Sequence, residues 1–424
     1  MLNPKEALDI VLATVETLET EATPLEQALG LVLAEDIISR DDIPPFDNSA
    51  MDGYAVRWED VAEAAADHPV TLDVIDDIKA GDTPLKEIMP GAAARIMTGA
   101  QMPVGADTVV RVEDTTTDDG GAREAFETDE SDGSSFKPVT ITVKVKSKGN
   151  VRRAGEDVAT GEKVIDAGRE LKPAEIGLLA SLGFPEVQTV RRARIAIVTT
   201  GDELLEVGQP LEPGKIRNSN AYSLAAQITE AGAIPIRLGI ASDTKEAARK
   251  LFTEALDQAD IVLTTGGVSV GKYDVVKDVL DEMGAEQKFW KIAQKPGHPL
   301  GFWVLNGRYV FGLPGNPVAT MVCFEEYVRP AIRKMMGRTY LFRPEVQAIL
   351  TSDIRKRPGR LHYIRVRVQK KNGDYYAEST GPQGSGILKS MVLADGLALI
   401  PPEIESVKAG ERVRTRLISQ PEDH

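Results

Sequence analysis

The sequence predicts a multidomain protein with an α/β domain, a helical domain interrupted by a β-rich insertion, and a small β barrel or sandwich. Three observations support this prediction. The chain has 424 residues, which favours about three domains. Residues 190–336 alternate short apolar runs with helical patterns, which is typical of a parallel sheet covered by helices on both faces. Residues 44–150 and 340–420 instead show short alternating strands separated by turns.

The amino-terminal segment is expected to be mostly helical. Residues 1–43 begin with MLNPKEALDIVLATVETLET, which has the pattern of an amphipathic helix. A second helix is predicted from about Pro173 to Leu182. If these two helices pack together, the β-rich segment between them is an insertion into one helical domain. The predicted domains are residues 1–43 with 151–185, residues 44–150, residues 186–336 and residues 337–424.

The α/β segment contains four predicted strands, each followed by a helix. The strands are RIAIVTTG, IPIRLGIA, DIVLTT and RYVFGLPG. Asp243 and Glu246 form the capping signature of the helix that follows the second strand. The repeated Thr-Thr-Gly in IAIVTTGDE and IVLTTGGVS indicates two strand-to-helix turns in one sheet. In the β-rich part, residues 113–138 are acidic and rich in Gly and Ser, which predicts a long hairpin loop.

The composition excludes several classes of protein. The formal charge is −15, from 50 Lys and Arg against 65 Asp and Glu, which opposes non-specific binding to nucleic acid. No apolar run reaches the roughly 18 residues of a membrane span. Cys323 is the single cysteine, so an internal disulfide and a cysteine-rich metal site are excluded. The amino terminus lacks the basic start and unbroken apolar stretch of a signal peptide, so a cytoplasmic protein is expected.

The stretch with the most chemical content is a glycine-rich loop, TTGGVSVGKYD, at residues 264–274. It follows a buried strand and precedes a helix, where free N–H groups and close backbone approach favour phosphate binding. Residues 266–272 also spell most of a Walker A motif, but Tyr273 stands where Ser or Thr should bind Mg²⁺, which argues against a P-loop NTPase. Asp274 is interpreted as a Mg²⁺ ligand, and the alternative is stabilisation of the first helical turn.

Three further stretches are candidates for function. GLPGNP at residues 312–317 is either a tight connection or a second set of backbone amides that face the ligand. FWKIAQKPGHP presents Lys291 and Lys295 near the end of a strand. Isolated lysines are ordinarily solvated, but these two are expected near both phosphate-binding turns. PPFDNSAMDGYAVR, from Pro44 to Arg57, has the chemistry of a linker that enters a strand.

Together these motifs resemble those of the molybdopterin molybdenumtransferases, the family that includes the E domain of gephyrin. The resemblance covers nearly the whole chain and rests, in this order, on FDNSAMDGYAVR, RIMTGA, GADTVVRVED, GEDVATG, TTGDEL, TTGGVSVGKYD, FWKIAQKPG, GLPGNP and GPQGSG. It implies an elongated homodimer with a shared active site, an α/β molybdopterin-binding domain and a carboxyl-terminal β-barrel. It also implies that adenylylated molybdopterin reacts with molybdate or tungstate in the presence of Mg²⁺, which releases AMP.

The resemblance implies roles for particular residues. Asp52 would enter the cleft of the partner subunit, and Thr98 would contribute from the same side. Asp243 matches an acidic position, although a role as a helix cap explains it equally well. The implied catalytic residues are Asp52, Glu203, Asp274, Lys291 and Lys295, and the implied metal ligands are Asp274, Glu203 and Asp243. The implied substrate-binding residues are Thr98, Gly266, Gly267, Ser269, Gly271, Gly315, Asn316, Arg360 and Ser385.

Two histidines depart from the family pattern. Many members have Lys at the position of His298 and Asp at the position of His362. Because a mostly neutral imidazole attracts an anion less than a lysine does, ligand affinity or metal choice is expected to differ. Two alternatives stay open: a molybdopterin adenylyltransferase, which would consume ATP, and a non-catalytic scaffold. A molybdopterin adenylyltransferase and molybdoenzyme apoproteins are the expected partners, whereas nucleic acid and membranes are not.

Overall fold

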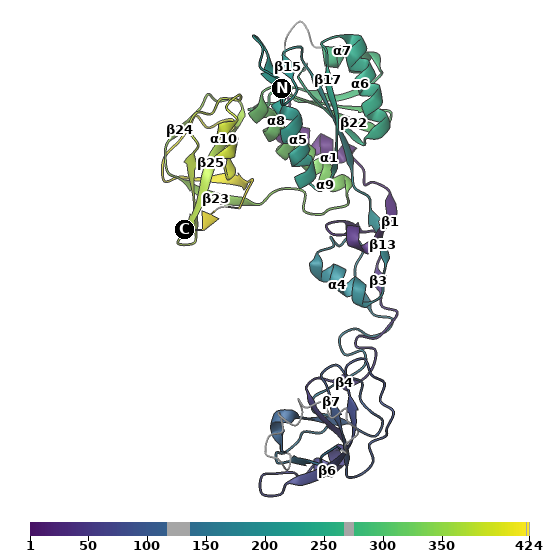
Figure 1. Cartoon of the computed structure of the whole chain (residues 1–424). Coiled ribbons are helices and arrows are strands. Elements are labelled where there is room, and N and C mark those ends of the chain that lie inside the picture. Colours follow the sequence, from purple (N-terminus) through teal and green to yellow (C-terminus); the bar gives the residue numbers. More distant parts are fainter. Residues whose placement is uncertain (117–135, 267–274, 421, 424) are drawn as a thin grey trace. The chain divides into compact units, whose positions relative to one another are not determined.

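A computed structural model describes residues 1–116, 136–266, 275–420 and 422–423, and the chain divides into two compact units (Figure 1). The main unit contains residues 1–34, 168–172 and 186–424. The insertion unit contains residues 35–167 and 173–185. Among the described residues, none of the helices has both the length and the apolar character that crossing a membrane would require.

The centre of the main unit is a six-stranded sheet with the order β17-β14-β18-β22-β21-β19. The first four strands are parallel, as the sequence predicts, but β21 pairs antiparallel with both of its neighbours, β22 and the edge strand β19. The hairpin between β21 and β22 turns at Asn306 and Gly307, whose positive φ angles of 50° and 75° are typical of a type I′ turn. The strands are β14 Arg194–Thr200, β17 Ile234–Ala241, β18 Ile261–Thr265, β19 Glu286–Trp290, β21 Gly301–Leu305 and β22 Arg308–Leu313.

Helices cover both faces of this sheet, which confirms the three-layer α/β domain. Ile195 and Ile197 of β14 pack with α1, α5 and the α8–α9 segment, whereas the alternate residues Ala196 and Val198 pack with α6 and α7. Alternate side chains of a strand point to opposite faces, so both faces of β14 are buried. The helices are α1 Pro4–Thr14, α5 Ser219–Glu230, α6 Lys245–Gln258, α7 Val275–Glu282, α8 Pro317–Cys323, the π-helical turn η3 Phe324–Val328 and α9 Arg329–Met335.

Residues 1–43 contain less helix than the sequence suggested. The helix α1 begins with a capping box formed by Asn3 and Glu6, and it packs against α9 and η3 of the main unit. The second expected helix, α4 Pro173–Ser181, belongs to the insertion unit. Between them the chain forms the turn η1 Leu25–Gln27 and a small sheet of β1 Thr20–Pro24, β2 Val32–Leu33 and β13 Glu186–Val190. The strand β1 forms because β13, which is distant in sequence, pairs with its whole length.

The insertion unit is rich in short strands, as predicted for residues 44–150. Its largest sheet has the order β8-β5-β7-β6-β10-β9. The pairing of β9 with β10 places the ends of the acidic segment 113–138 in a hairpin, while residues 117–135 lie outside the described part. The elements are β3 Ile37–Ile38, β4 Asn48–Ser49, β5 Gly53–Val56, α2 Trp58–Val61, β6 Val70–Ile78, β7 Ala92–Ile96, β8 Thr108–Arg111, η2 Val112–Asp114, β9 Thr115–Thr116, β10 Val139–Ile141, β11 Val151–Arg152 and β12 Lys163–Ile165.

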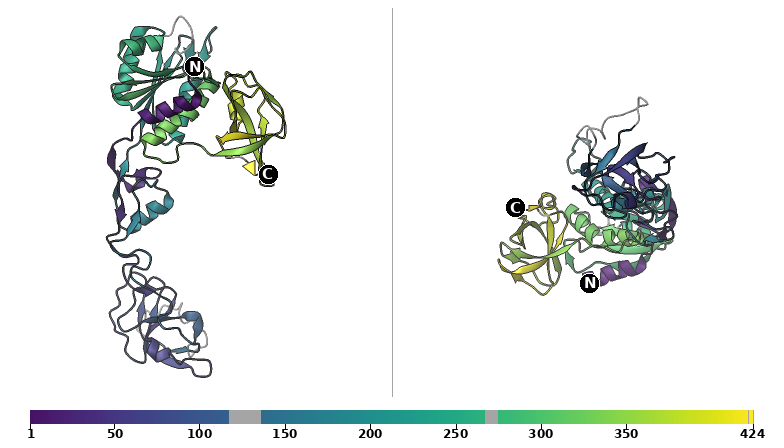
Figure 2. Two further views of the ribbon diagram at one scale, coloured as in Figure 1. Left: turned by 180° about the vertical axis from the view of Figure 1, so that it is seen from behind. Right: turned by 90° about the horizontal axis from the view of Figure 1, so that it is seen from below.

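The carboxyl-terminal part of the main unit is a closed barrel and not a sandwich. Its strands follow the order β25-β26-β23-β29-β27, and β27 pairs again with β25, which closes the ring (Figure 2). The short strand β20, from the α/β domain, pairs in parallel with β25. The elements are β20 Gln294–Lys295, β23 Glu345–Leu350, β24 Ile354–Arg355, β25 Leu361–Lys371, β26 Asp374–Ser379, α10 Lys389–Val392, β27 Gly396–Ile400, β28 Ser406–Val407, β29 Arg412–Leu417 and β30 Glu422–Asp423.

Candidate functional site

Two glycine turns meet at the carboxyl edge of the central sheet. The parallel strands β18 and β22 are neighbours, and each ends at one of these turns. Gly266 has a φ of 88°, and a Cβ atom at this position would collide with the carbonyl oxygen of Thr200. A Cβ atom on Gly315 would lie 3.8 Å from the Cα of Gly266. The structure therefore brings together two predicted turns. Gly267, Ser269, Gly271 and Asp274 lie outside the described residues.

The turn that contains Gly315 is fixed by two hydrogen bonds from different elements. The Nδ2 atom of Asn220 in α5 donates to the carbonyl oxygen of Gly315 at 2.8 Å. The backbone N of Val318, in the first turn of α8, donates to the carbonyl oxygen of Ser385 at 3.1 Å. The second bond brings Ser385 next to Asn316, the N-cap residue of α8. Because Val318 already has this partner, its amide is not available to an anion.

A pair of carboxylates lies at the ends of β14 and β17. The backbone N of Asp202 donates to Oδ2 of Asp243 at 3.3 Å, and the backbone N of Asp243 donates to Oδ1 of Asp202 at 3.2 Å. The helix α6 is capped by Thr244, whose Oγ1 accepts from the N of Ala247. The expectation that Asp243 caps this helix is therefore wrong. Asp202 was not predicted, although its position directly after β14 was a usable signal.

Glu203 completes the acidic edge of this region. Its carboxylate folds back over the chain, because a Cβ atom built on Gly201 would lie 2.6 Å from Oε2 of Glu203. Asp202 and Asp243 each keep one carboxylate oxygen without a hydrogen bond in the described part of the chain. Magnesium usually takes one or two protein carboxylates together with water and substrate phosphate, so these residues fit Mg²⁺. No cluster of three or more His, Cys, Asp or Glu residues with metal-binding geometry occurs among the described residues.

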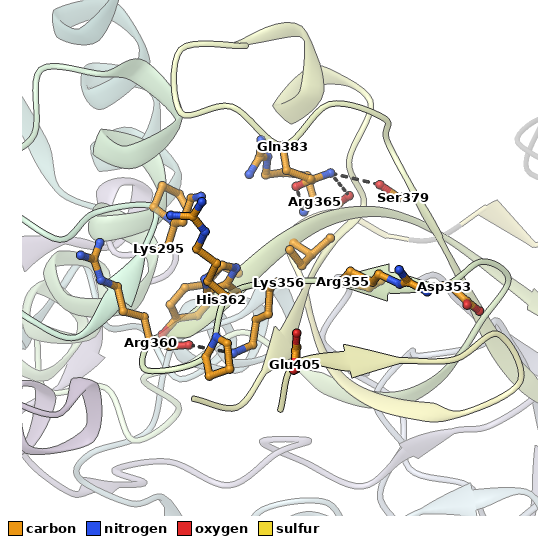
Figure 3. Close-up of a pocket in the computed structure, with 16 residues that line it drawn as sticks. Lys295, Asp353, Arg355, Lys356, Arg360, His362, Arg365, Ser379, Gln383 and Glu405 are labelled. Carbon is orange, nitrogen blue, oxygen red and sulfur yellow. Dashed lines mark hydrogen bonds between the residues drawn. The ribbon is translucent and has the colours of Figure 1, made fainter. Parts of the chain in front are cut away.

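A cavity of about 960 Å³ opens between β20 and the barrel (Figure 3). Lys295 of β20 is the register partner of His362 in β25, so two distant segments present their side chains side by side. Arg360 lies in the turn that leads into β25. The charged residues of the lining are Lys295, Asp353, Arg355, Lys356, Arg357, Arg360, Arg365 and Glu405.

Two cations in this cavity are buried without a counter-ion. Lys356 is 9% exposed, and its Nζ donates to the carbonyl oxygens of Arg360 at 3.2 Å and Pro402 at 3.3 Å. Burial lowers the pKa of Lys356. Arg365 is 1% exposed, and burial lowers the pKa of its guanidinium to about 10. Neither residue forms an ion pair with any residue that the structure describes. Buried charges are ordinarily paired, so the cavity is prepared for an anion.

His362 lies among these cations and is uncharged at neutral pH. Burial lowers the pKa of its imidazole to about 4, with further contributions from the positive charges of Lys356, Lys295 and Arg360. In Figure 3 its side chain lies between Lys295 and Lys356. The sequence marked His362 only as a departure from the family pattern. The structure places it in the wall of the cavity.

The other residues of the FWKIAQKPGHP stretch lie differently. Lys291 has a φ of 66° and places its Nζ 6.0 Å from the ring centre of Trp290, and it is not part of the cavity lining. The Nδ1 atom of His298 lies 2.7 Å from the carbonyl oxygen of Ile292, so this ring is held by its own loop. Lys295 and Arg360 therefore line the same cavity, whereas Lys291 is not part of its lining.

In the insertion unit, the two predicted site residues are in direct contact. The backbone N and the Oγ1 of Thr98 both donate to Oδ1 of Asp52, each at 2.7 Å. Both residues are exposed. The two motifs that contain them are distant in sequence, so their contact supports a common role for Asp52 and Thr98.

Comparisons with known proteins agree with this arrangement. Three family models match: "MoeA N-terminal region (domain I and II)" over residues 2–183, "Probable molybdopterin binding domain" over residues 196–334, and "MoeA C-terminal region (domain IV)" over residues 347–417. A molybdopterin molybdenumtransferase from Haemophilus influenzae is 38% identical over 93% of this chain and 93% of its own length. The chain belongs to the molybdopterin molybdenumtransferase family. The relative of the same name from Bacillus subtilis is also 38% identical, over 95% of this chain and 90% of its own length.

A solved structure resembles this family member along its whole length. The molybdopterin biosynthesis MoeA protein from Pyrococcus horikosii superposes with a TM-score of 0.81 at 32% identity and covers 99% of this chain and 100% of its own. This similarity agrees with the combination of an α/β domain and a carboxyl-terminal barrel. In this family member, sequence reasoning missed Asp202, which lies within the TTGDEL motif, and it missed Lys356 and Arg365, which packing brings into the cavity lining.

Proposed function

We propose that this chain is an enzyme that transfers molybdenum from molybdate to adenylylated molybdopterin and releases AMP. One observation carries the proposal: two adjacent residues connect the cationic cavity to the glycine turns. The carbonyl of Gly384 accepts from Nη2 of Arg365 in the cavity wall at 3.0 Å. The carbonyl of the next residue, Ser385, accepts from Val318 beside the Gly315 turn. An oxyanion in the cavity and a phosphate at the glycine turns would then bind close to the same loop.

The cavity is assigned to molybdate. Lys295 and Arg360 supply the charges that attract the oxyanion, and several directed donors hold such a group better than one. Lys356 and Arg365 add fixed positive charge from the buried side of the cavity. These cations have no counter-ions in the described chain. A bound dianion would therefore supply the negative charge that the protein itself does not provide.

The glycine turns are assigned to the phosphate of the pterin substrate. Gly266, Gly315 and Asn316 form one side of this cradle, and Gly267, Ser269 and Gly271 are proposed to form the other. Glu203, Asp243 and Asp274 are proposed to hold Mg²⁺, with Asp202 as a further carboxylate. When bound, Mg²⁺ would neutralise negative charge on the phosphates that link the pterin to AMP. The protein itself contributes mainly positioning and electrostatic stabilisation, as in other phosphoryl chemistry.

A homodimer with shared active sites is part of the proposal. Asp52 of the partner subunit, oriented by Thr98 of the partner subunit, is proposed to complete each site. Mixing inactive Asp52→Ala subunits with inactive Asp274→Asn subunits should restore part of the AMP release. Absence of any complementation would show that one chain forms each site alone. A cytoplasmic location, interaction with a molybdopterin adenylyltransferase, and delivery of the cofactor to apoenzymes stay predictions.

The activity is tested by measuring AMP release from adenylylated molybdopterin with molybdate and Mg²⁺. The wild-type chain should release AMP, and Lys295→Ala should reduce this release by about 100-fold or more because an interaction with the transferred oxyanion is lost. Lys371→Ala is the matched control, because Lys371 is an exposed lysine at the end of β25 and is not part of the cavity lining, and its effect should be clearly smaller. Consumption of ATP with molybdopterin, without AMP release from the adenylylated form, would instead indicate the adenylyltransferase. Absence of both reactions would favour the non-catalytic scaffold.

A further inference from the structure

The cavity lining contains one histidine among the described residues, His362, and its side chain is neutral at physiological pH. We propose that His362 takes up one proton when a tetrahedral dianion binds in the cavity, so that anion binding is coupled to pH. The inference rests on the proposed function only in assigning the cavity to an oxyanion. It adds a role for a residue that neither the mechanism above nor any motif uses.

The geometry leaves the imidazole of His362 ready for a ligand. The side chain is 8% exposed and lies in the cavity wall. Neither ring nitrogen of His362 forms a hydrogen bond with any residue that the structure describes. Neither ring nitrogen is among the fully buried polar atoms that lack a partner in the described chain, so the imidazole is open to the cavity, where a bound ligand can reach it. Its register partner Lys295 lies on the adjacent strand, where the same ligand can reach both side chains.

The charges around His362 explain why it is neutral before an anion binds. Lys356, Lys295 and Arg360 all lower the pKa of the imidazole, in addition to burial. Of the two acids in the lining, Asp353 is paired with Lys408 at 2.8 Å, so its negative charge does little to offset the cations around the imidazole. The remaining charged groups of the lining are Arg355, Arg357, Arg365 and Glu405. The negative charge of Glu403, on the turn after β27, raises the pKa of Lys356 in opposition to burial.

A dianion reverses this electrostatic balance. An opposite charge within about 4–6 Å raises the pKa of a histidine by about 1–3, and two negative charges also neutralise the neighbouring cations. The pKa of His362 should therefore rise from about 4 in the free protein to about 6–7 in the complex. Between these two values the complex holds one more proton than the free protein. The affinity should then increase as the pH falls, by up to about tenfold for each pH unit. A monovalent anion supplies half of this charge, so its affinity should depend less strongly on pH.

The test uses sulfate as the probe, because sulfate stays divalent across the whole pH range. Sulfate binding to the full chain is measured by titration calorimetry at pH 5.5, 6.5 and 7.5, in two buffers that differ in ionisation enthalpy. The wild type should bind sulfate about 10-fold or more tightly at pH 5.5 than at pH 7.5 and should take up close to one proton at the acidic end. His362→Gln keeps a hydrogen-bond donor but cannot titrate, so it should bind sulfate with little pH dependence.

Controls make each outcome decisive. His68→Gln, which removes an exposed histidine in the insertion unit, should keep the wild-type pH dependence. Perchlorate, a monovalent tetrahedral anion, should bind more weakly and with less proton uptake. No measurable sulfate binding by the wild type, an affinity independent of pH, or equal pH dependence in wild type and His362→Gln would each overturn the inference. If His362→Gln fails to fold, the wild type measured in the two buffers still tests the inference, because sulfate binding without proton uptake would contradict it. Because no pterin is present, AMP release can fail or succeed independently of this result.

Discussion

The guanidinium of Arg365 donates from Nη2 to the carbonyl oxygen of Gly384 at 3.0 Å. Its Nε donates to Oγ of Ser390 in α10 at 3.1 Å. These two bonds hold the loop that carries Ser385 against the barrel, while the bond from Val318 to Ser385 holds the same loop against α8. Arg365 therefore fixes the position of a loop that both halves of the proposed site share.

Replacing Arg365 with Met should weaken the use of molybdate. The change removes the hydrogen bond to the buried Ser390, which is worth about 1–3 kcal/mol, and also the bond to the carbonyl of the exposed Gly384. We expect kcat/KM for molybdate to fall about tenfold or more, mainly through KM, with partial rescue by Arg365→Lys. Arg367→Met, an exposed change on the same strand, is the control. Equal kinetics in the two Met variants would show that Arg365 has no positioning role.

Gly266→Ala should damage both stability and activity. A non-glycine residue in the left-handed region costs about 1–3 kcal/mol, and the new Cβ would also meet the carbonyl of Thr200. Gly208→Ala is a matched control, because Gly208 has a φ of 98° with no heavy atom within 4 Å of a built Cβ. Thermal unfolding should show a larger loss for Gly266→Ala, and AMP release should fall only in that variant. Equal losses would mean that the close contact with Thr200 is unimportant.

Asp260 should contribute strongly to the stability of the main unit. It is 4% exposed, and it accepts from Nη1 and Nη2 of Arg191, each at 2.8 Å, and from the backbone N of Arg194 at 2.9 Å. Removing one partner of a buried ion pair costs about 3–5 kcal/mol, so Asp260→Asn should lower the free energy of unfolding by about this amount at pH 7. Chemical denaturation measures this loss. Asp257→Asn, an exposed change nearby, should cost less than about 0.5 kcal/mol.

The contribution of Asp260 should also depend on pH with a defined sign. Burial alone raises the pKa of its carboxyl, but the bonds from Arg191 and Arg194 and the charges of Arg191 and Arg308 outweigh burial and lower it. A carboxyl whose pKa is lower in the folded state stabilises the fold above its unfolded pKa of about 3.9 and loses this effect as the pH falls through the folded value. The stability difference between wild type and Asp260→Asn should therefore shrink from pH 6 to pH 2. A constant difference would contradict this assignment.

Thr98→Val should reduce activity without unfolding the insertion unit. The change removes the Oγ1 donor to Asp52 but keeps the backbone donor, so the carboxylate becomes less precisely oriented. We expect AMP release to fall about tenfold, with restoration by Thr98→Ser. Since Thr98 is exposed, the midpoint of thermal unfolding should change little. Full activity of Thr98→Val would remove Thr98 from the proposed site.

Much of the fold could be predicted because its signals are local. The four strand–helix units follow from apolar runs and caps that each lie within a few neighbouring residues. The turns at Gly266 and Gly315 could be recognised for the same reason, since a left-handed or closely approached backbone requires glycine. The content of helix in residues 1–43 was overestimated, because β1 depends on pairing with β13, which lies far along the chain.

The sequence by itself determined the α/β alternation, the glycine turns and the motifs that contain Asp52, Lys295 and Arg360. The tertiary structure decided which of these meet: it pairs Lys295 with His362 and leaves Lys291 outside the cavity. It also buries Arg365 without a carboxylate partner among the described residues, which no local pattern indicates. The physical reason is that propensity and periodicity act over one element, whereas register, burial and charge pairing depend on surfaces that only chain closure brings together.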